Sequence, residues 1–86
     1  MNQKNPNVNL LLHLEALAQQ AGCEIVYADM PGKGGLACYG GKKRFIMNQF
    51  LLTEEKSVLL CEGLRKMDLV TLYMLPVVRK AIYGEE

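Results

Sequence analysis

The segment LACYGGKKRFIM, residues 36–47, decides the fold class. Gly40-Gly41 separate two segments that we expect to be strands, and two adjacent glycines supply the positive φ angles that a tight hairpin turn needs. With the turn at these glycines, one face of the hairpin carries four apolar side chains: Leu36, Cys38, Phe45 and Met47. We expect this face to pack against helices, which would bury Cys38.

The residues before the hairpin predict a helix and a first strand. Leucines and alanines recur at three- and four-residue spacing up to Ala21, which indicates an amphipathic helix. Asn7 or Asn9 would cap its start, and Gly22 would end it in a left-handed conformation. The β-branched and aromatic residues at 24–28 then predict a strand.

The residues after the hairpin predict helices. Thr53 is expected to be an N-cap, because two glutamates follow it where the helix dipole favours negative charge. Gly63 costs about 1 kcal/mol inside a helix, so it predicts close packing against a neighbour. Asp68 could begin a further short helix, and Pro76 opens a closing helix that ends at Gly84.

This order of elements predicts an α+β fold. We expect an N-terminal helix, a three-stranded and mainly antiparallel sheet with the Gly-Gly hairpin, and then two to three helices packed on one face. Residues 1–86 are short enough for a single domain, with 1–7 expected to be a flexible N-terminal tail.

Composition narrows the class of protein. Ten basic and nine acidic residues leave a formal charge of +1. So small a net charge produces no strong field that would attract nucleic acid, so we do not expect nucleic-acid binding. Half of the residues are hydrophobic, but no run is long enough to span a membrane. Three cysteines behind a polar N-terminus predict free thiols and a cytoplasmic location.

Sequence motifs for catalysis, metals and cofactors are weak. Residues 32–37 match G-x-G-x-x-A, but a strand follows where a dinucleotide site needs a helix. The four soft metal ligands lack the close pairs typical of zinc sites: His13, Cys23, Cys38 and Cys61. We therefore expect no cofactor, no metal and no catalytic residue. Cys38 and Cys61 are instead predicted to be buried, unreactive thiols.

A basic cluster follows the hairpin turn. Lys42, Lys43 and Arg44 stand beside Tyr39 and Phe45, a combination that could bind RNA through phosphate contacts and base stacking. The simpler interpretation is that the charges protect an exposed strand end from edge-to-edge aggregation.

The C-terminal region contains more apolar residues than one helix stripe can bury. Four of them are candidates for a second, exposed apolar surface: Val70, Met74, Val78 and Tyr83. Such a surface predicts a symmetric homodimer or a contact with another protein. Met74→Glu would then split the dimer and leave the monomer folded.

Several segments carry a resemblance to known proteins. The GGLAC segment at 34–38, LTEEK at 52–56 and LPVVR at 75–79 resemble a group of short, uncharacterised bacterial proteins, which implies no known activity. More distantly, the order of helix, strands and helix, with Asn48 before the capped second helix, is similar to the front half of ImmA/IrrE-type metallopeptidases. Their H-E-x-x-H motif binds zinc, whereas CEGLR at 61–65 keeps only Glu62.

The distant resemblance implies a zincin-like scaffold without its metal. Two functional alternatives stay open beside the non-enzymatic interaction domain that we expect. One is a metal-binding or enzymatic remnant that uses Cys38, Cys61 and Glu62. The other is an RNA-binding module that uses the basic hairpin.

Overall fold

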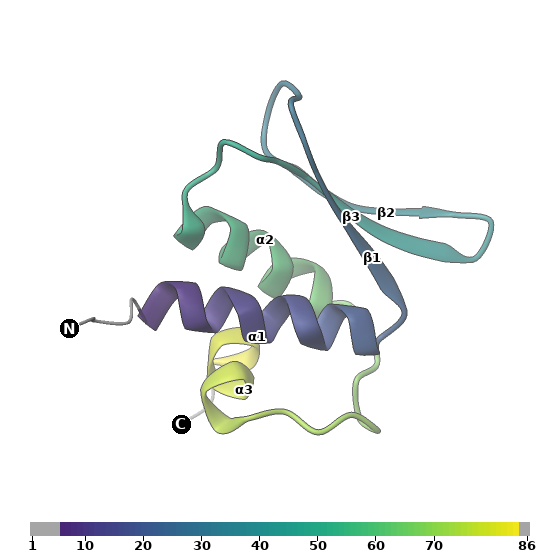
Figure 1. Ribbon diagram of the computed structural model, residues 1–86. Helices are drawn as coiled ribbons and strands as arrows, with labels where there is room; N and C mark the ends of the chain where they lie inside the picture. The colour runs from purple at the N-terminus through teal and green to yellow at the C-terminus, as the bar shows by residue number, and fades with distance from the viewer. Residues whose placement is uncertain (1–5, 85–86) are drawn as a thin grey trace.

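The computed structural model describes residues 6–84. Its elements are α1 (Pro6–Gln20), β1 (Cys23–Ala28), β2 (Gly34–Tyr39), β3 (Lys42–Asn48), α2 (Thr53–Arg65) and α3 (Pro76–Tyr83) (Figure 1). Of the tail predicted at residues 1–7, residues 1–5 lie outside the described part, and Pro6 and Asn7 begin α1. Asn7 and Asn9 are therefore helical residues, and neither occupies the N-cap position that was predicted for one of them. Proline suits the first turn, where its missing N–H has no intrahelical partner.

The sheet is mixed, which corrects the prediction of a mainly antiparallel sheet. Its strand order is β1-β3-β2, with β1 parallel and β2 antiparallel to β3. A central strand has neighbours on both sides, so it suits large apolar side chains on the face that packs against the helices. Phe45 and Met47 give β3 such a face and are completely buried, whereas β2 begins with Gly34-Gly35. The first strand therefore pairs with β3 and not with its neighbour in the sequence.

The hairpin turn forms as predicted. Gly40 and Gly41 have φ angles of 54° and 82°, and Tyr39 pairs with Lys42 on either side of them. The hairpin is, however, longer than the helix layer that covers it, and its tip projects past α2 (Figure 1). Cys38 lies in this projecting part and is exposed, so the prediction that it is buried is wrong.

The core lies between the sheet and the helices. α1 and α2 pack against each other on one face of the sheet, and α3 packs against both (Figure 1). Fully buried side chains from the sheet and from the three helices meet there, the largest being Phe45, Leu14, Met47, Leu60, Leu64 and Ile82. Within residues 6–84, no helix combines the length and the apolar composition that crossing a membrane requires.

Gly63 packs closely against the sheet, as its position inside a helix predicted. A Cβ atom built on Gly63 would lie 2.3 Å from Cε1 and 2.6 Å from Cζ of Phe45. Real Cβ atoms essentially never come so close to another heavy atom. The ring of Phe45 thus occupies the space that any other residue at position 63 would need.

Asn48 holds two connections together. Its Nδ2 donates to the carbonyl oxygens of Met30 at 3.0 Å and Gly32 at 2.9 Å, while its Oδ1 accepts the N–H of Phe50 at 2.9 Å. The β1–β2 connection and the β3–α2 connection are therefore fixed to each other by one side chain. This arrangement sets where α2 begins.

The start of α2 differs from the prediction by one residue. Leu52 occupies the N-cap position, and Thr53 is the first helical residue. The carboxylate of Glu55 accepts the N–H of Leu52 at 3.0 Å. A side chain from within the helix thus satisfies a backbone donor at its start, the contact that a glutamate at this position commonly makes.

Candidate functional site

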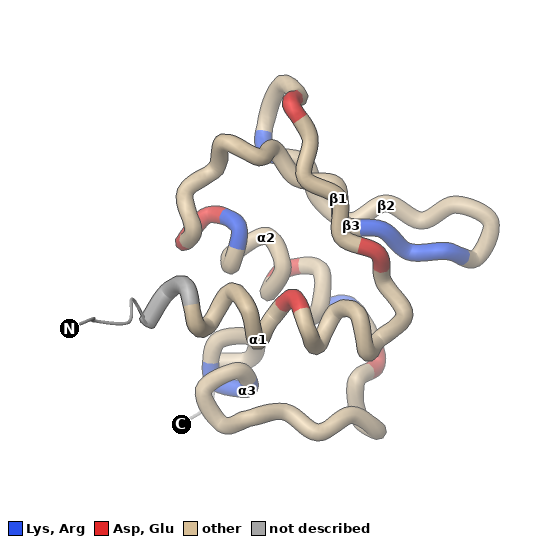
Figure 2. Tube along the Cα trace, in the orientation of Figure 1, with Lys and Arg blue, Asp and Glu red and all other residues tan. Residues whose placement is uncertain are grey.

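The exposed side of α1 carries almost no charge (Figure 2). Glu15 is the one ionised side chain in the described helix, and it accepts a hydrogen bond from the hydroxyl of Tyr27 on β1. Burial, followed by this contact with Glu15, raises the pKa of the Tyr27 hydroxyl. Lys56 of α2 lies 4.8 Å from the centre of the Tyr27 ring. Glu15 is thus turned toward the sheet. The exposed side of α1 carries apolar residues such as Leu12 and Ala16.

The linker between α2 and α3, residues 66–75, is irregular, so the short helix that could begin at Asp68 does not form. The carboxylate of Asp68 instead accepts the N–H of Val70 at 3.2 Å, and the N–H of Leu72 donates to the carbonyl of Leu69 at 3.0 Å. Without a helical period, buried and exposed residues of the linker can be neighbours in the chain. Leu69 and Met74 are buried, whereas Val70 and Tyr73 are 83% and 77% exposed.

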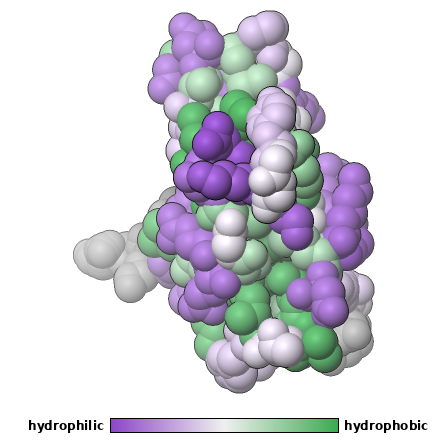
Figure 3. Space-filling model, turned by 90° about the vertical axis from the view of Figure 1, so that its right-hand side faces the viewer, coloured by the Kyte–Doolittle hydropathy of each residue, from purple (hydrophilic) through white to green (hydrophobic). Residues whose placement is uncertain are grey.

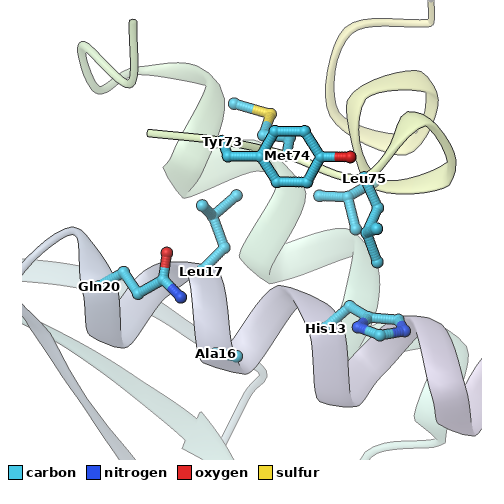
Figure 4. Close-up of a pocket in the computed structure, with 8 residues that line it drawn as sticks. His13, Ala16, Leu17, Gln20, Tyr73, Met74 and Leu75 are labelled. Atoms are coloured by element: carbon cyan, nitrogen blue, oxygen red, sulfur yellow. The ribbon is translucent and has the colours of Figure 1, made fainter. Parts of the chain in front are cut away.

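A groove of about 260 Å³ lies between α1 and the end of this linker. Its floor consists of the buried side chains Leu17, Met74 and Val78. Figure 4 shows His13, Leu17 and Gln20 on α1 on one side, with Tyr73 and Leu75 facing them from the other. The residues that line the groove include no aspartate, glutamate, lysine or arginine. We call this feature the groove and treat it as the candidate site.

The four residues that the sequence suggested for an apolar surface differ in exposure. Val70 and Tyr83 are exposed, but Met74 and Val78 are buried, so those two were assigned to the surface wrongly. Val78 and Ile82 form the buried stripe of α3, and Met74 fills the core beside them. The exposed apolar side chains are instead their neighbours Tyr73, Leu75 and Val77.

Sequence reasoning missed these neighbours because it read the linker with the period of a helix. Pro76 is the signal that could have found them. A proline keeps the residue before it in an extended conformation, and Leu75 has φ −62° and ψ 149°. Figure 3 shows hydrophobic side chains mixed with weakly polar ones at the lower end of the molecule, where Figure 1 places the linker.

The predicted basic patch is smaller than its sequence suggested. Lys42 and Lys43 are exposed near the tip of the hairpin, but Arg44 pairs with Glu24 of β1. The two Arg44–Glu24 contacts measure 2.7 Å from Nη2 and 2.8 Å from Nε. The three residues begin β3, the central strand, and the two lysines stand at its exposed end beside the turn.

Most residues of the stretch CEGLR at 61–65 have a structural role: Cys61 and Leu64 lie in the core, and Gly63 packs against Phe45. Arg65 donates from Nε to the carbonyl oxygen of Ile82 at 2.7 Å, which ties the end of α2 to α3. Cys61 is buried beside a second, shallow depression of about 340 Å³, and Glu62 is exposed at its rim. Within residues 6–84, no group of three or more His, Cys, Asp or Glu side chains is placed to hold a metal ion.

The three thiols differ in accessibility, and this difference can be measured. Burial raises the pKa of the Cys23 and Cys61 thiols, which lowers their thiolate fraction at neutral pH. Cys38 is exposed. With a thiol reagent on the folded protein, we expect one fast reaction at Cys38 and reactions at least about tenfold slower at the other two thiols.

The variant Cys38→Ser should abolish the fast phase and leave the slow ones unchanged. Denaturant should make all three thiols of the wild type equally fast. A fast phase that survives in Cys38→Ser would contradict the burial of Cys23 and Cys61.

No family model matches the chain, and no match was found among the curated proteins or among the solved structures.

Proposed function

We propose that this chain is a non-enzymatic protein-interaction domain that pairs with a second copy of itself through the groove. The observation that carries the proposal is Tyr73, whose aromatic side chain is 77% exposed at the rim of an apolar groove. Tyrosine is among the residues that dominate the binding energy of protein interfaces, because it buries a large area at a small cost in conformational entropy.

The groove is suited to a two-fold symmetric contact. In such a contact both copies present the same surface, so this surface must be complementary to itself. A projecting group in one copy then contacts a recessed part of the other, and the reverse contact forms as well. Each chain supplies both a projecting ring, Tyr73, and an apolar floor formed by Leu17, Met74 and Val78. Two rings could therefore be buried at once. Burial of one such side chain contributes on the order of 2 kcal/mol.

The charge distribution favours this pairing. Residues 69–78 contain no ionisable side chain that is charged at neutral pH, and the groove-facing part of α1 adds only His13. Two copies can approach along this surface without like-charge repulsion, although the whole chain carries a formal charge of +1.

The test is the mass in solution, measured by light scattering after size exclusion over a range of micromolar concentrations. We expect a mass close to twice the chain mass of 9.6 kDa at the upper end of the range. Tyr73→Arg should shift the protein to a monomer, because the dimer would bury two unpaired guanidinium groups. Phe50→Arg is the matched control, since Phe50 is a 72% exposed aromatic residue that does not line the groove.

A wild-type mass that stays at that of one chain on concentration would reject the homodimer. Dissociation by Phe50→Arg as strong as that by Tyr73→Arg would assign the contact to another surface. Circular dichroism of both variants shows whether the monomer fold is retained.

A further inference from the structure

We infer that the free edge of β2 binds an extended peptide segment with acidic side chains, which adds to the sheet as a fourth strand. β2 lies at the end of the strand order, and within the described residues no other strand lies beyond it. Strand addition of this kind gains affinity from main-chain hydrogen bonds and selectivity from the side chains beside them. The surface is separate from the groove.

The register of the hairpin shows which backbone groups point outward. The N–H of Asn48 donates to the carbonyl oxygen of Lys33 at 3.0 Å, so these two residues form a hydrogen-bonded pair. Hydrogen-bonded and non-hydrogen-bonded pairs alternate along an antiparallel ladder. Ala37 therefore bonds inward to β3, while Leu36 and Cys38 direct their N–H and C=O groups away from the sheet.

The edge of β2 lacks the devices that usually prevent strand addition. Edge strands are commonly protected by charged residues or by proline. Residues 34–39 contain neither. The opposite edge strand, β1, carries Glu24, which is held in an ion pair with Arg44. A strand added beside β2 would therefore meet no charged side chain of β2, whereas a strand added beside β1 would meet Glu24.

Cations stand at both ends of this edge and indicate an acidic occupant. Lys42 and Lys43 follow the turn (Figure 2). Within the described residues, neither of them forms an ion pair. Lys33 precedes β2, and its Nζ lies 3.9 Å from a carboxylate oxygen of Glu55, with both side chains more than a third exposed. An acidic segment would complement these charges.

A second copy of β2 fits this edge poorly. In a two-fold antiparallel pairing the start of one strand lies beside the end of the other. Lys33 of each copy would then approach Lys42 of the other, and like charges placed this way are unfavourable. The hydrogen bonds of two outward residues contribute only about 0.5–1.5 kcal/mol each, so this repulsion would cancel much of the gain.

The experiment uses a capped heptapeptide, Asp-Glu-Val-Thr-Val-Thr-Val, added to the full chain labelled with ¹⁵N. At concentrations on the order of 1 mM, we expect the amide signals of Leu36 and Cys38 to shift and their hydrogen exchange to slow at least about tenfold. The amide of Ala37, already bonded to β3, should change little. The same peptide with two lysines in place of its acidic residues should bind at least about threefold more weakly at low salt.

Cys38→Pro supplies the matched variant. It removes an outward N–H and leaves the hydrogen bonds to β3 in place, a substitution that edge strands tolerate. We expect it to weaken binding of the acidic peptide at least about threefold, whereas Cys38→Ser, which keeps the N–H, should bind as the wild type does. Tyr73→Arg should also bind normally, which separates this test from that of the groove.

Three results would overturn the inference. One is a set of peptide-induced shifts that excludes Leu36 and Cys38 in the wild type. Another is unchanged binding by a folded Cys38→Pro variant. The third is that mixed-sequence single-stranded RNA shifts these amides while the acidic peptide does not, which would assign the lysines to nucleic acid.

Discussion

Gly63→Val should remove most of the free energy of unfolding of this domain. The first carbon of the new side chain would fall 2.3 Å from the ring of Phe45, and Phe45 is completely buried. Overpacking by a single methylene group already costs about 1–3 kcal/mol, and valine adds three carbons. Natural domains are stable by only about 5–15 kcal/mol. We expect a loss of at least about 3 kcal/mol, measured as a lower midpoint of urea unfolding.

Glu62→Val is the control for Gly63→Val. It introduces the same β-branched residue at the preceding, exposed position of α2 and should change stability by no more than about 0.5 kcal/mol. The combination of Gly63→Ala with Phe45→Leu tests the contact itself. Because leucine vacates the space of the ring, the double variant should lose less stability than the sum of the two single ones. Strict additivity would contradict the contact.

Met74→Glu should unfold the monomer, contrary to what the sequence alone predicted for it. Met74 is 8% exposed and packs in the core with Val78 and Ile82. A carboxylate at this position would lose its hydration without gaining a partner, so we expect a cost of at least about 3 kcal/mol at neutral pH. Phe50→Glu, which places the same side chain on an exposed aromatic position, should cost well under about 1 kcal/mol.

The pH dependence of Met74→Glu identifies the cause of its instability. Burial raises the pKa of a carboxyl group above its ordinary value of about 4.3, because the charged form is disfavoured. The variant should therefore be most stable below that value and lose stability as the pH rises through the raised pKa. A folded variant whose only defect is the loss of the dimer would show that Met74 lies at the surface.

The fold could be predicted from the sequence wherever neighbouring residues determine the conformation. Gly40-Gly41 specify the turn because both positions need a positive φ. Gly63 indicated close packing because glycine has no other advantage inside a helix. Pro76 and Gly84 marked the bounds of α3 for similarly local reasons. Each of these interpretations depends on a few adjacent residues.

The strand order could not be predicted in the same way. The alternation of side chains in β1 shows which face of the strand is buried but not which strand lies beside it. Pairing with β3 depends on the large side chains of Phe45, Ile46 and Met47, which lie about 20 residues further along the chain. The exposure of Cys38 likewise depends on how far α2 extends along the hairpin. The residues next to Cys38 in the sequence do not indicate where α2 ends.

For the candidate apolar surface, the sequence indicated exposed residues, but two of those it indicated are buried. The excess of apolar residues after Asp68 correctly indicated an exposed apolar surface. Assigning individual residues to it required the conformation of the linker, which has no regular period. Met74 and Tyr73 are neighbours in the chain, yet one fills the core and the other projects into solvent. The contribution of α1 to the groove was not foreseen either, since it arises from tertiary packing.

The ion pair between Glu24 and Arg44 affects the register in which β1 pairs with β3. These residues lie directly opposite each other in the parallel pair of β1 and β3. A slip of β1 by one residue would turn Cys23, Ile25 and Tyr27 away from the helices, because successive side chains point to opposite faces. The same slip would take Glu24 out of line with Arg44. An exposed ion pair contributes little free energy, typically under about 1 kcal/mol. Here it distinguishes the native alignment from its nearest competitor, so its effect is on which sheet forms more than on how stable that sheet is.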